Sequence, residues 1–318
     1  MAAPMTEDTN VVSPEIPAFL ELEATGCCNL TCTHCYASSG PGVGHGIMTP
    51  ADWEKVIDQA TALGVRTIQL IGGEPTIAPY FTRLVRYALG VGLNVNVYSN
   101  LVRVTPALFD LLARPGVSLS TSWYTADPVV HAQITGSKTA WASTRANIAE
   151  AVRRGIPVRA AIIDGIVPGQ DVAAAEADLR ALGVTDIRVR PVQGAGRAAA
   201  DGRENNPSEL CGHCGIGRAA VLPDGQLTPC VIGRWMHTGN VRETPIGEIL
   251  AGQAWRDALA SVPRMADPCA PECPPASDGD DCPPASQPAC APSYCAPDTG
   301  DIVSSPVPLT RVIAGRAG

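Results

Sequence analysis

The sequence is poor in several features that mark common classes of protein. Aromatic residues make up 4% of its 318 residues and charged residues 17%, and the formal net charge is −8. No basic run and no basic patch interleaved with aromatic residues occurs, so nucleic acid is not expected as a partner. No stretch of about 18 apolar residues occurs either, which excludes a membrane-spanning helix.

The N-terminal residues also lack the features of a secretory signal, which are a positive segment followed by an apolar one. We therefore expect a cytoplasmic protein in which residues 1–16 are disordered. A reducing compartment disfavours structural disulfides, so thiols there are expected to bind metal or to take part in catalysis. The chain has twelve cysteines, and their positions are the main guide to its function.

Apolar runs of strand length alternate with amphipathic runs of helix length from residue 17 to about residue 191. The six predicted strands cover residues 18–24, 67–73, 93–100, 116–122, 156–163 and 186–192. Predicted helices at 49–63 and 141–154 each end near a glycine, and Thr49 and Pro50 suit a helix cap and first turn. With right-handed crossovers this repeat predicts an α/β fold, a partial (β/α)6 TIM-like barrel over residues 17–198.

The composition changes after the barrel. Residues 199–210 are predicted to be a linker. Residues 219–232 favour a hairpin that turns at Pro223, Asp224 and Gly225, and residues 244–262 favour a helix. The stretch 263–308 has almost no apolar residues, so its order would depend on bound metal. We expect a small cysteine-rich domain over residues 211–300 and a tail over 301–318.

Four of the cysteines lie close together in the stretch "GCCNLTCTHCY", residues 26–36. Cys28, Cys32 and Cys35 can bind three irons of a four-iron, four-sulfur cluster and leave the fourth iron open to a substrate. Structural zinc is the alternative, but it usually takes four protein ligands, and His34 would have to double back to supply one. Cys27 is interpreted as a small buried residue.

This cysteine spacing resembles the cluster-binding motif of radical S-adenosylmethionine (SAM) enzymes. Further stretches resemble elements of that family in the same order along the chain, namely "GGEP" (72–75), "YSN" (98–100), "SLS" (118–120) with "HAQITG" (131–136), and "GAGRA" (194–198). We expect these elements at the C-terminal ends of strands, where parallel barrels place their chemistry. Each stretch is weak alone, and their order along the chain is what favours the family.

The resemblance implies roles for several residues. Backbone groups of Gly72 and Gly73 and the carboxylate of Glu74 would meet the SAM amino group, and Asn100 and Ser120 would bond the ribose or carboxylate. His34 stands where the family usually carries an aromatic residue that packs on adenine. Capping of strand ends is the alternative for Asn100 and Ser120, and a solvent-facing loop histidine is the alternative for His34.

The implied reaction begins when SAM chelates the open iron through its amino and carboxylate groups. One electron, from a flavodoxin- or ferredoxin-type donor, would cleave the bond between sulfur and C5′, and the resulting 5′-deoxyadenosyl radical would abstract hydrogen from the substrate. No catalytic residue that acts on the substrate is predicted.

Eight cysteines follow the barrel, and the stretch that begins with the first of them resembles the auxiliary-cluster domain called SPASM. They are Cys211, Cys214, Cys230, Cys269, Cys273, Cys282, Cys290 and Cys295. Two four-iron clusters would need eight thiolates, whereas a single auxiliary cluster would leave thiols free to donate a hydrogen atom. The distal cysteines are spaced more loosely than in the family, so the ligands of each cluster stay open. A zinc ribbon is the alternative for Cys211 and Cys214.

Within the resemblance, the first interpretation is a peptide-modifying maturase, an oxidoreductase that crosslinks or epimerises a ribosomally made peptide. The first 17 residues are too few for a leader-binding domain, so a separate protein or the barrel itself would recognise a leader. The second interpretation is a radical dehydrogenase or epimerase acting on a sugar or antibiotic intermediate. An iron-sulfur electron carrier is disfavoured, because it needs neither an open-iron motif nor "GGEP".

Overall fold

One curved sheet organises residues 16–199 and 205–263, which are the residues that a computed structural model of the chain describes. Its strand order is β6-β5-β4-β3-β2-β1-β7-β8-β9. The first six strands are parallel, as predicted. They are β1 (Phe19–Thr25), β2 (Thr67–Gly72), β3 (Asn94–Tyr98), β4 (Val117–Trp123), β5 (Val158–Asp164) and β6 (Asp186–Pro191).

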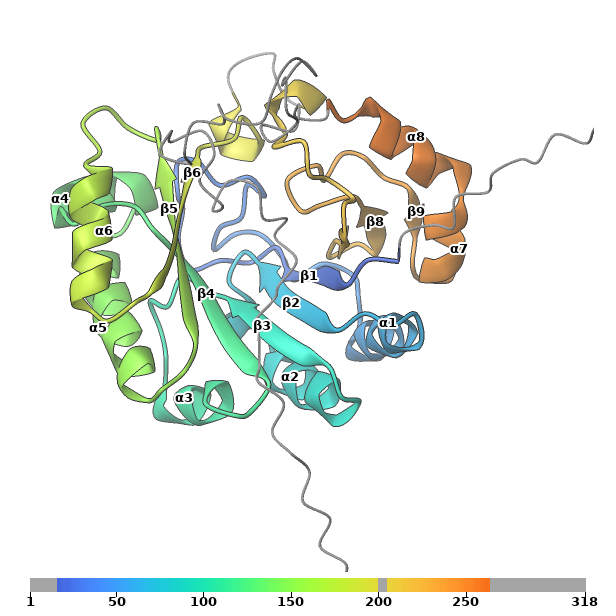
Figure 1. Ribbon diagram of the computed structural model, residues 1–318, viewed down its shortest axis with the longest axis horizontal. Coiled ribbons are helices and arrows are strands. Elements are labelled where there is room, and N and C mark those ends of the chain that lie inside the picture. The colour runs from blue at the N-terminus through green and yellow to red at the C-terminus, as the bar shows by residue number, and fades with distance from the viewer. Residues whose placement is uncertain (1–15, 200–204, 264–318) are drawn as a thin grey trace, which may run out of the picture.

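Helices α1 to α6 cover the outer face of these strands (Figure 1). They are α1 (Pro50–Ala62), α2 (Phe81–Gly90), α3 (Pro106–Leu112), α4 (Pro128–Thr135), α5 (Ala140–Arg153) and α6 (Val172–Ala181). Alternate strand residues face these helices and form the main core, among them Leu20, Leu22, Ile68, Leu70, Val95 and Val97. The residues between them face the inner, concave side, so the outer face supplies the apolar burial and the inner face can be polar.

The start of α1 shows how local sequence sets the elements. Thr49 caps the helix by accepting a hydrogen bond from the backbone N–H of Asp52, whose side chain bonds back to Thr49. Pro50 occupies the first turn, where a missing N–H costs nothing. The cap predicted from the sequence is confirmed.

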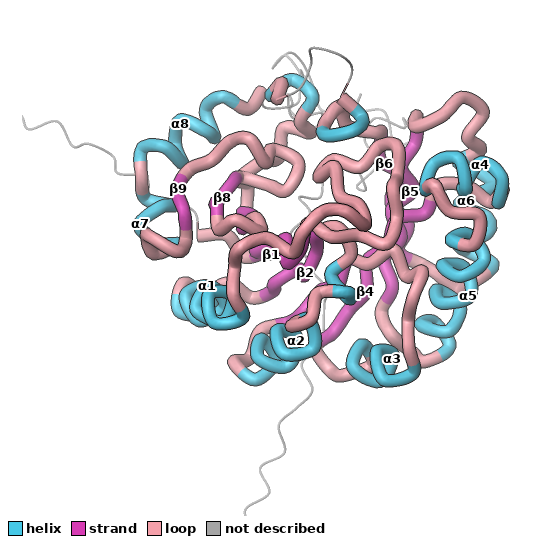
Figure 2. The backbone as a smooth tube through the Cα atoms, turned by 180° about the vertical axis from the view of Figure 1, so that it is seen from behind, coloured by secondary structure: helices cyan, strands magenta, loops and turns pink. Residues whose placement is uncertain are grey.

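The C-terminal part continues the same sheet (Figure 2). β7 (Arg218–Val221) pairs in parallel with β1, and β8 (Gln226–Thr228) returns antiparallel from the predicted turn, so the hairpin is confirmed. β9 (Gly239–Asn240) completes the sheet. The prediction of a single helix over residues 244–262 is wrong. Gly252 adopts an extended conformation and divides it into α7 (Ile246–Ala251) and α8 (Gln253–Ser261).

Several expectations fall on residues outside the described ranges. These are the disorder of residues 1–15, the metal-dependent order of residues 264–300, and the tail. No helix within the described ranges is both long and apolar enough to cross a membrane.

Candidate functional site

The loop that leaves β1 carries Cys28, Cys32 and Cys35. Cys28 is buried, and the other two thiols are half-buried. Burial raises the pKa of Cys28 to about 11, and the charge of Cys35 adds to the rise. Burial and the charges of Cys28 and Cys35 raise the pKa of Cys32 to about 12. The three thiols are therefore near enough to repel one another as thiolates, which a group of bound iron atoms would relieve.

Backbone N–H groups point at the sulfurs of this loop. The N–H of Leu30 donates to Cys28 Sγ at 3.4 Å, and the N–H of Ser39 donates to Cys35 Sγ at 3.3 Å. Hydrogen bonds to cysteine sulfur are characteristic of iron-sulfur sites and tune their potentials. Each cysteine would bind a different iron, so the three need not converge on one ion. The loop therefore fits a four-iron cluster held by three cysteines.

The "GGEP" turn at the end of β2 lies directly against the cysteine loop. The N–H of Gly73 donates to the carbonyl of Thr25 at 2.7 Å, and the N–H of Glu74 donates to that of Cys27 at 2.8 Å. A Cβ at Gly73 would overlap the carbonyl oxygen of Cys27, and one at Gly72 would overlap that of Thr25. Glycine is therefore required at both positions by close backbone approach.

The carboxylate of Glu74 is buried and ties together the loops after β2 and β3. It accepts hydrogen bonds from the N–H and hydroxyl of Thr76 at 3.2 and 2.6 Å. It also accepts from the Ser99 hydroxyl and the Asn100 N–H, both at 2.8 Å. Burial raises the pKa of Glu74. Binding of the SAM ammonium by Glu74 stays a prediction, and the structure adds a role in fixing the loop that carries Asn100.

Asn100 reaches the cysteine loop, whereas Ser120 does not lie at a strand end. The side-chain NH2 of Asn100 donates to Asn29 Oδ1 at 2.8 Å and lies 3.8 Å from Cys28 Sγ. Its Oδ1 also accepts from the N–H of Val102 at 2.9 Å, as the capping alternative predicted. Ser120 lies within β4, where its hydroxyl donates to Asn96 Oδ1 at 3.0 Å.

His34 is half-buried rather than solvent-facing. Its ring packs edge-on against Tyr124, with the ring centres 4.9 Å apart. Burial and the charge of Arg197 lower the pKa of His34 to about 4, so the imidazole is neutral at neutral pH. Its Nδ1 has no partner within the described part of the chain. A neutral, flat ring is compatible with the adenine-packing role that the resemblance implies.

The remaining two motifs also contact the cysteine loop. The N–H groups of Thr31 and Thr33 donate to the carbonyls of Thr135 and Ile134, at the end of α4, at 3.3 and 2.9 Å. From "GAGRA", Arg197 donates to the Cys32 carbonyl at 2.7 Å. Of the motifs that the sequence singled out, only "SLS" makes no contact with this loop that the structure records.

Most of the polar inner face of the sheet was not predicted from the sequence. Asn96 Oδ1 accepts from Gln69 at 2.7 Å, and its NH2 donates to Ser118 at 2.9 Å, so these residues link β2, β3 and β4. The signal was present in "LNVNVYSN", where asparagines alternate with buried valines. Further along the sheet, Asp186 binds Arg159 and Arg188 at 2.7 and 3.0 Å, also on the inner face.

The structure brings three cysteines of the second group together. Cys214 Sγ lies 3.0 Å from Cys230 Sγ, and a hydrogen bond from Cys214 contributes most to lowering the pKa of Cys211 to about 4. The N–H of Gly233 donates to Cys230 Sγ at 3.3 Å. This donor set fits part of a further cluster. The other predicted ligands lie outside the described residues, namely Cys269, Cys273, Cys282, Cys290 and Cys295.

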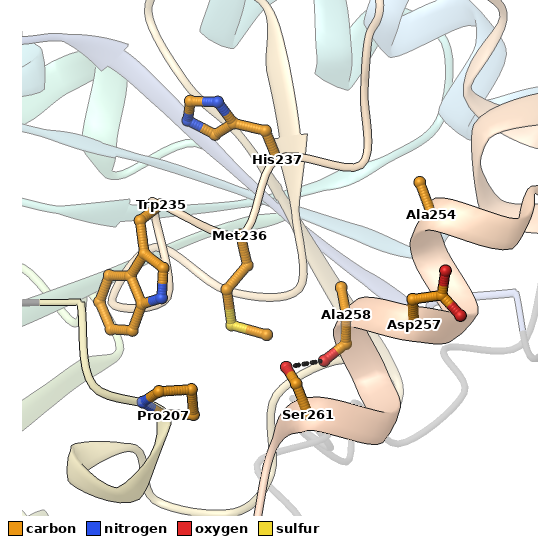
Figure 3. A pocket seen from close by; sticks show the side chains of 8 residues that line it. All are labelled: Pro207, Trp235, Met236, His237, Ala254, Asp257, Ala258 and Ser261. Carbon is orange, nitrogen blue, oxygen red and sulfur yellow. Dashed lines mark hydrogen bonds between the residues drawn. The ribbon is translucent and has the colours of Figure 1, made fainter.

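Apolar residues pack around two of these cysteines, whereas Cys211 is exposed. Met236 packs with Cys214 and Cys230 in one small core. Met236 also lines a hollow of about 410 Å³, together with Trp235 and residues of α8 such as Ala258 (Figure 3). Cys214 and Cys230 are buried, and restricted solvent access is one of the factors that set the potential of a cluster.

Two family descriptions match the chain. The Radical SAM superfamily matches residues 22–182, and the SPASM iron-sulfur cluster-binding domain matches residues 202–274. The first range holds Cys28, Cys32 and Cys35, and the second holds the three cysteines that the structure gathers.

Three curated relatives are similar over part of their length. The PqqA peptide cyclase of Ruegeria pomeroyi is 34% identical over 45% of this chain and 38% of its own. The AdoMet-dependent heme synthase of Methanosarcina barkeri is 32% identical over 42% and 38%. The mycofactocin maturase MftC of Mycobacterium tuberculosis is 36% identical over 31% and 25%. The chain thus spans less than two fifths of the length of each relative.

The fold also matches a solved structure. Streptococcus suis SuiB bound to the precursor peptide SuiA superimposes with a TM-score of 0.63, over 75% of this chain and 65% of that one, at 14% identity. This likeness confirms the predicted α/β, barrel-like fold.

Proposed function

Because this chain belongs to the radical SAM superfamily, we propose that it cleaves SAM reductively and uses the 5′-deoxyadenosyl radical to modify a ribosomally made peptide. The observation that carries the proposal is the second thiol group, Cys211, Cys214 and Cys230, held on the sheet that bears the SAM motif. Similarity to a peptide cyclase and a maturase supports a peptide substrate.

The residues of the chain have defined parts in this mechanism. Cys28, Cys32 and Cys35 would hold the cluster, which supplies the electron that cleaves SAM. Backbone groups of Gly72 and Gly73 would orient the amino end of SAM. The neutral His34 ring would pack on the adenine. The hydrogen bond from Asn100 to Asn29 would hold the loop after β3 beside Cys28.

The second cysteine group would hold an auxiliary cluster that takes up an electron after a crosslink forms or that anchors the peptide. One or two such clusters are compatible with the eight cysteines. A flavodoxin- or ferredoxin-type protein would donate the electron, and a separate protein or the barrel itself would recognise a leader peptide. We place the enzyme in the cytoplasm, where such thiols stay reduced.

The test is anaerobic incubation of the reconstituted protein with SAM, a reductant and the precursor peptide encoded beside its gene. We expect 5′-deoxyadenosine together with a changed peptide. Loss of two hydrogen atoms would mark a crosslink, and uptake of one deuterium from D2O would mark epimerisation. Formation of 5′-deoxyadenosine without any peptide change would contradict the peptide substrate and leave the radical chemistry intact.

A small-molecule substrate is the second candidate, and the similarity to a heme synthase favours it. In that case the enzyme would be a dehydrogenase or epimerase, for example on a sugar or antibiotic intermediate. Genes for sugar tailoring beside this gene, with no precursor peptide, would decide for it.

A further inference from the structure

Arg197 makes two hydrogen bonds to the cysteine loop from the far end of the sheet. Its side-chain Nε donates to the carbonyl of Cys32 at 2.7 Å, and its backbone N–H donates to the carbonyl of Cys35 at 3.0 Å. It lies in the short helical turn Gly196–Ala198, which follows β6 in the chain. One residue therefore fixes the backbone of two of the three cysteines that would bind the cluster.

Gly196 makes this contact possible. Its φ is +56°, and a Cβ on it would overlap the carbonyl oxygens of Tyr36 and Cys35. Any side chain at this position would push the turn away from the cysteine loop. The bonds of Arg197 therefore depend on a backbone contact that only glycine allows.

The charge of Arg197 acts on the same loop. The hydrogen bond from its Nε places the guanidinium against the backbone of Cys32. Within the described part of the chain, no carboxylate forms a salt bridge with Arg197. Arg197 therefore brings a positive charge to the cysteine loop without a carboxylate paired to it in the described residues.

We propose that Arg197 is a positioning residue of the SAM cluster, which holds the backbone of Cys32 and Cys35 and whose charge favours the reduced cluster. Reduction adds one electron, supplied by the donor protein or by dithionite, and a nearby positive charge stabilises the added negative charge. The inference rests on family membership and on the three cysteines. It does not depend on the identity of the substrate.

The test is a potentiometric titration of the anaerobically reconstituted full chain, followed by EPR. The SAM cluster is recognised by the change in its signal when SAM is added. At the potential where half of the wild-type cluster is reduced, Arg197→Gln should lower the ratio of reduced to oxidised cluster about tenfold, or 59 mV for one electron. Arg197→Lys keeps the charge and should stay within about threefold of wild type.

The matched control is Arg86→Gln, which removes one exposed positive charge from α2, on the outer face. It should leave the ratio unchanged. A ratio in Arg197→Gln equal to that in Arg86→Gln would overturn the electrostatic part of the proposal.

Cluster retention tests the positioning part. Arg197→Lys and Gly196→Ala should each lose iron from the SAM cluster to a chelator several-fold faster than wild type, because each breaks the bond to Cys32. If both variants lose iron at the rate of Arg86→Gln, the positioning role is wrong. If Arg197→Gln assembles no SAM cluster while Arg86→Gln does, the positioning role is supported. A ratio in Arg197→Lys more than threefold from wild type would then overturn the electrostatic part.

Discussion

Arg234 Nη1 lies 2.6 Å from Glu23 Oε2, and this ion pair joins the loop after Cys230 to the end of β1. The Glu23 side chain is fully buried. Two residues earlier in the strand, Glu21 accepts a hydrogen bond from the N–H of Val231 at 3.3 Å. The second cysteine group is thus anchored on the strand that delivers the first.

Replacing Arg234 with methionine should destabilise the protein strongly. The buried Glu23 carboxylate would lose its partner, and removing one member of a buried pair typically costs about 3–5 kcal/mol. Burial already raises the pKa of Glu23 and the Arg234 charge lowers it, so the variant should raise this pKa further. An unpaired Glu23 would then take up a proton more readily. The loss of unfolding free energy relative to wild type, measured by urea unfolding, should therefore be smaller at pH 6 than at pH 8.

The double variant Glu23→Gln/Arg234→Met is the control, because it removes both charges. We expect it to recover much of the loss seen in Arg234→Met. An equal loss in the double variant would show that packing of Arg234, rather than its charge, is what matters.

Changing Cys28, Cys32 and Cys35 together to alanine should abolish 5′-deoxyadenosine formation and remove about four irons per chain. The matched variant changes Cys211, Cys214 and Cys230. It should also lose iron, yet keep SAM cleavage, because its cysteines belong to the other group. Iron analysis and measurement of 5′-deoxyadenosine in both variants test these expectations. Unchanged SAM cleavage in the first variant would contradict the assignment of the SAM cluster.

Gly73→Ala should weaken SAM binding by about tenfold or more, because its Cβ would overlap the carbonyl oxygen of Cys27 and displace the turn. Gly90→Ala is the control, since a Cβ there has nothing within 4 Å. Equilibrium dialysis of SAM against the reconstituted proteins measures the difference. Equal affinity in the two variants would show that the turn after β2 does not orient SAM.

Local pattern was enough to predict the strands, the α1 cap and the cysteine loop, because each is set by residues near one another in the sequence. The Arg234–Glu23 pair could not be predicted, since its partners are 211 positions apart. The strand containing Ser120 was predicted almost correctly, but the resemblance of "SLS" to a family element placed Ser120 at the strand end, and β4 runs three residues past it. The break at Gly252 was missed because a single glycine inside a helical pattern is often tolerated.

His131 should make the protein less stable as the pH falls. Its side chain is buried between Trp123 and Tyr124, at ring distances of 5.4 and 5.5 Å, and burial lowers its pKa to about 4. The unfolded chain has the ordinary value of about 6.5, so it binds more protons than the folded chain between these values. Stability is therefore lost as the pH falls through this window, by about 2 kcal/mol between pH 7 and pH 5. The urea midpoint of His131→Phe should depend less on pH over this range than that of wild type, while the exposed His237→Phe should behave as wild type. The same pH dependence in His131→Phe and wild type would show that other groups control acid stability.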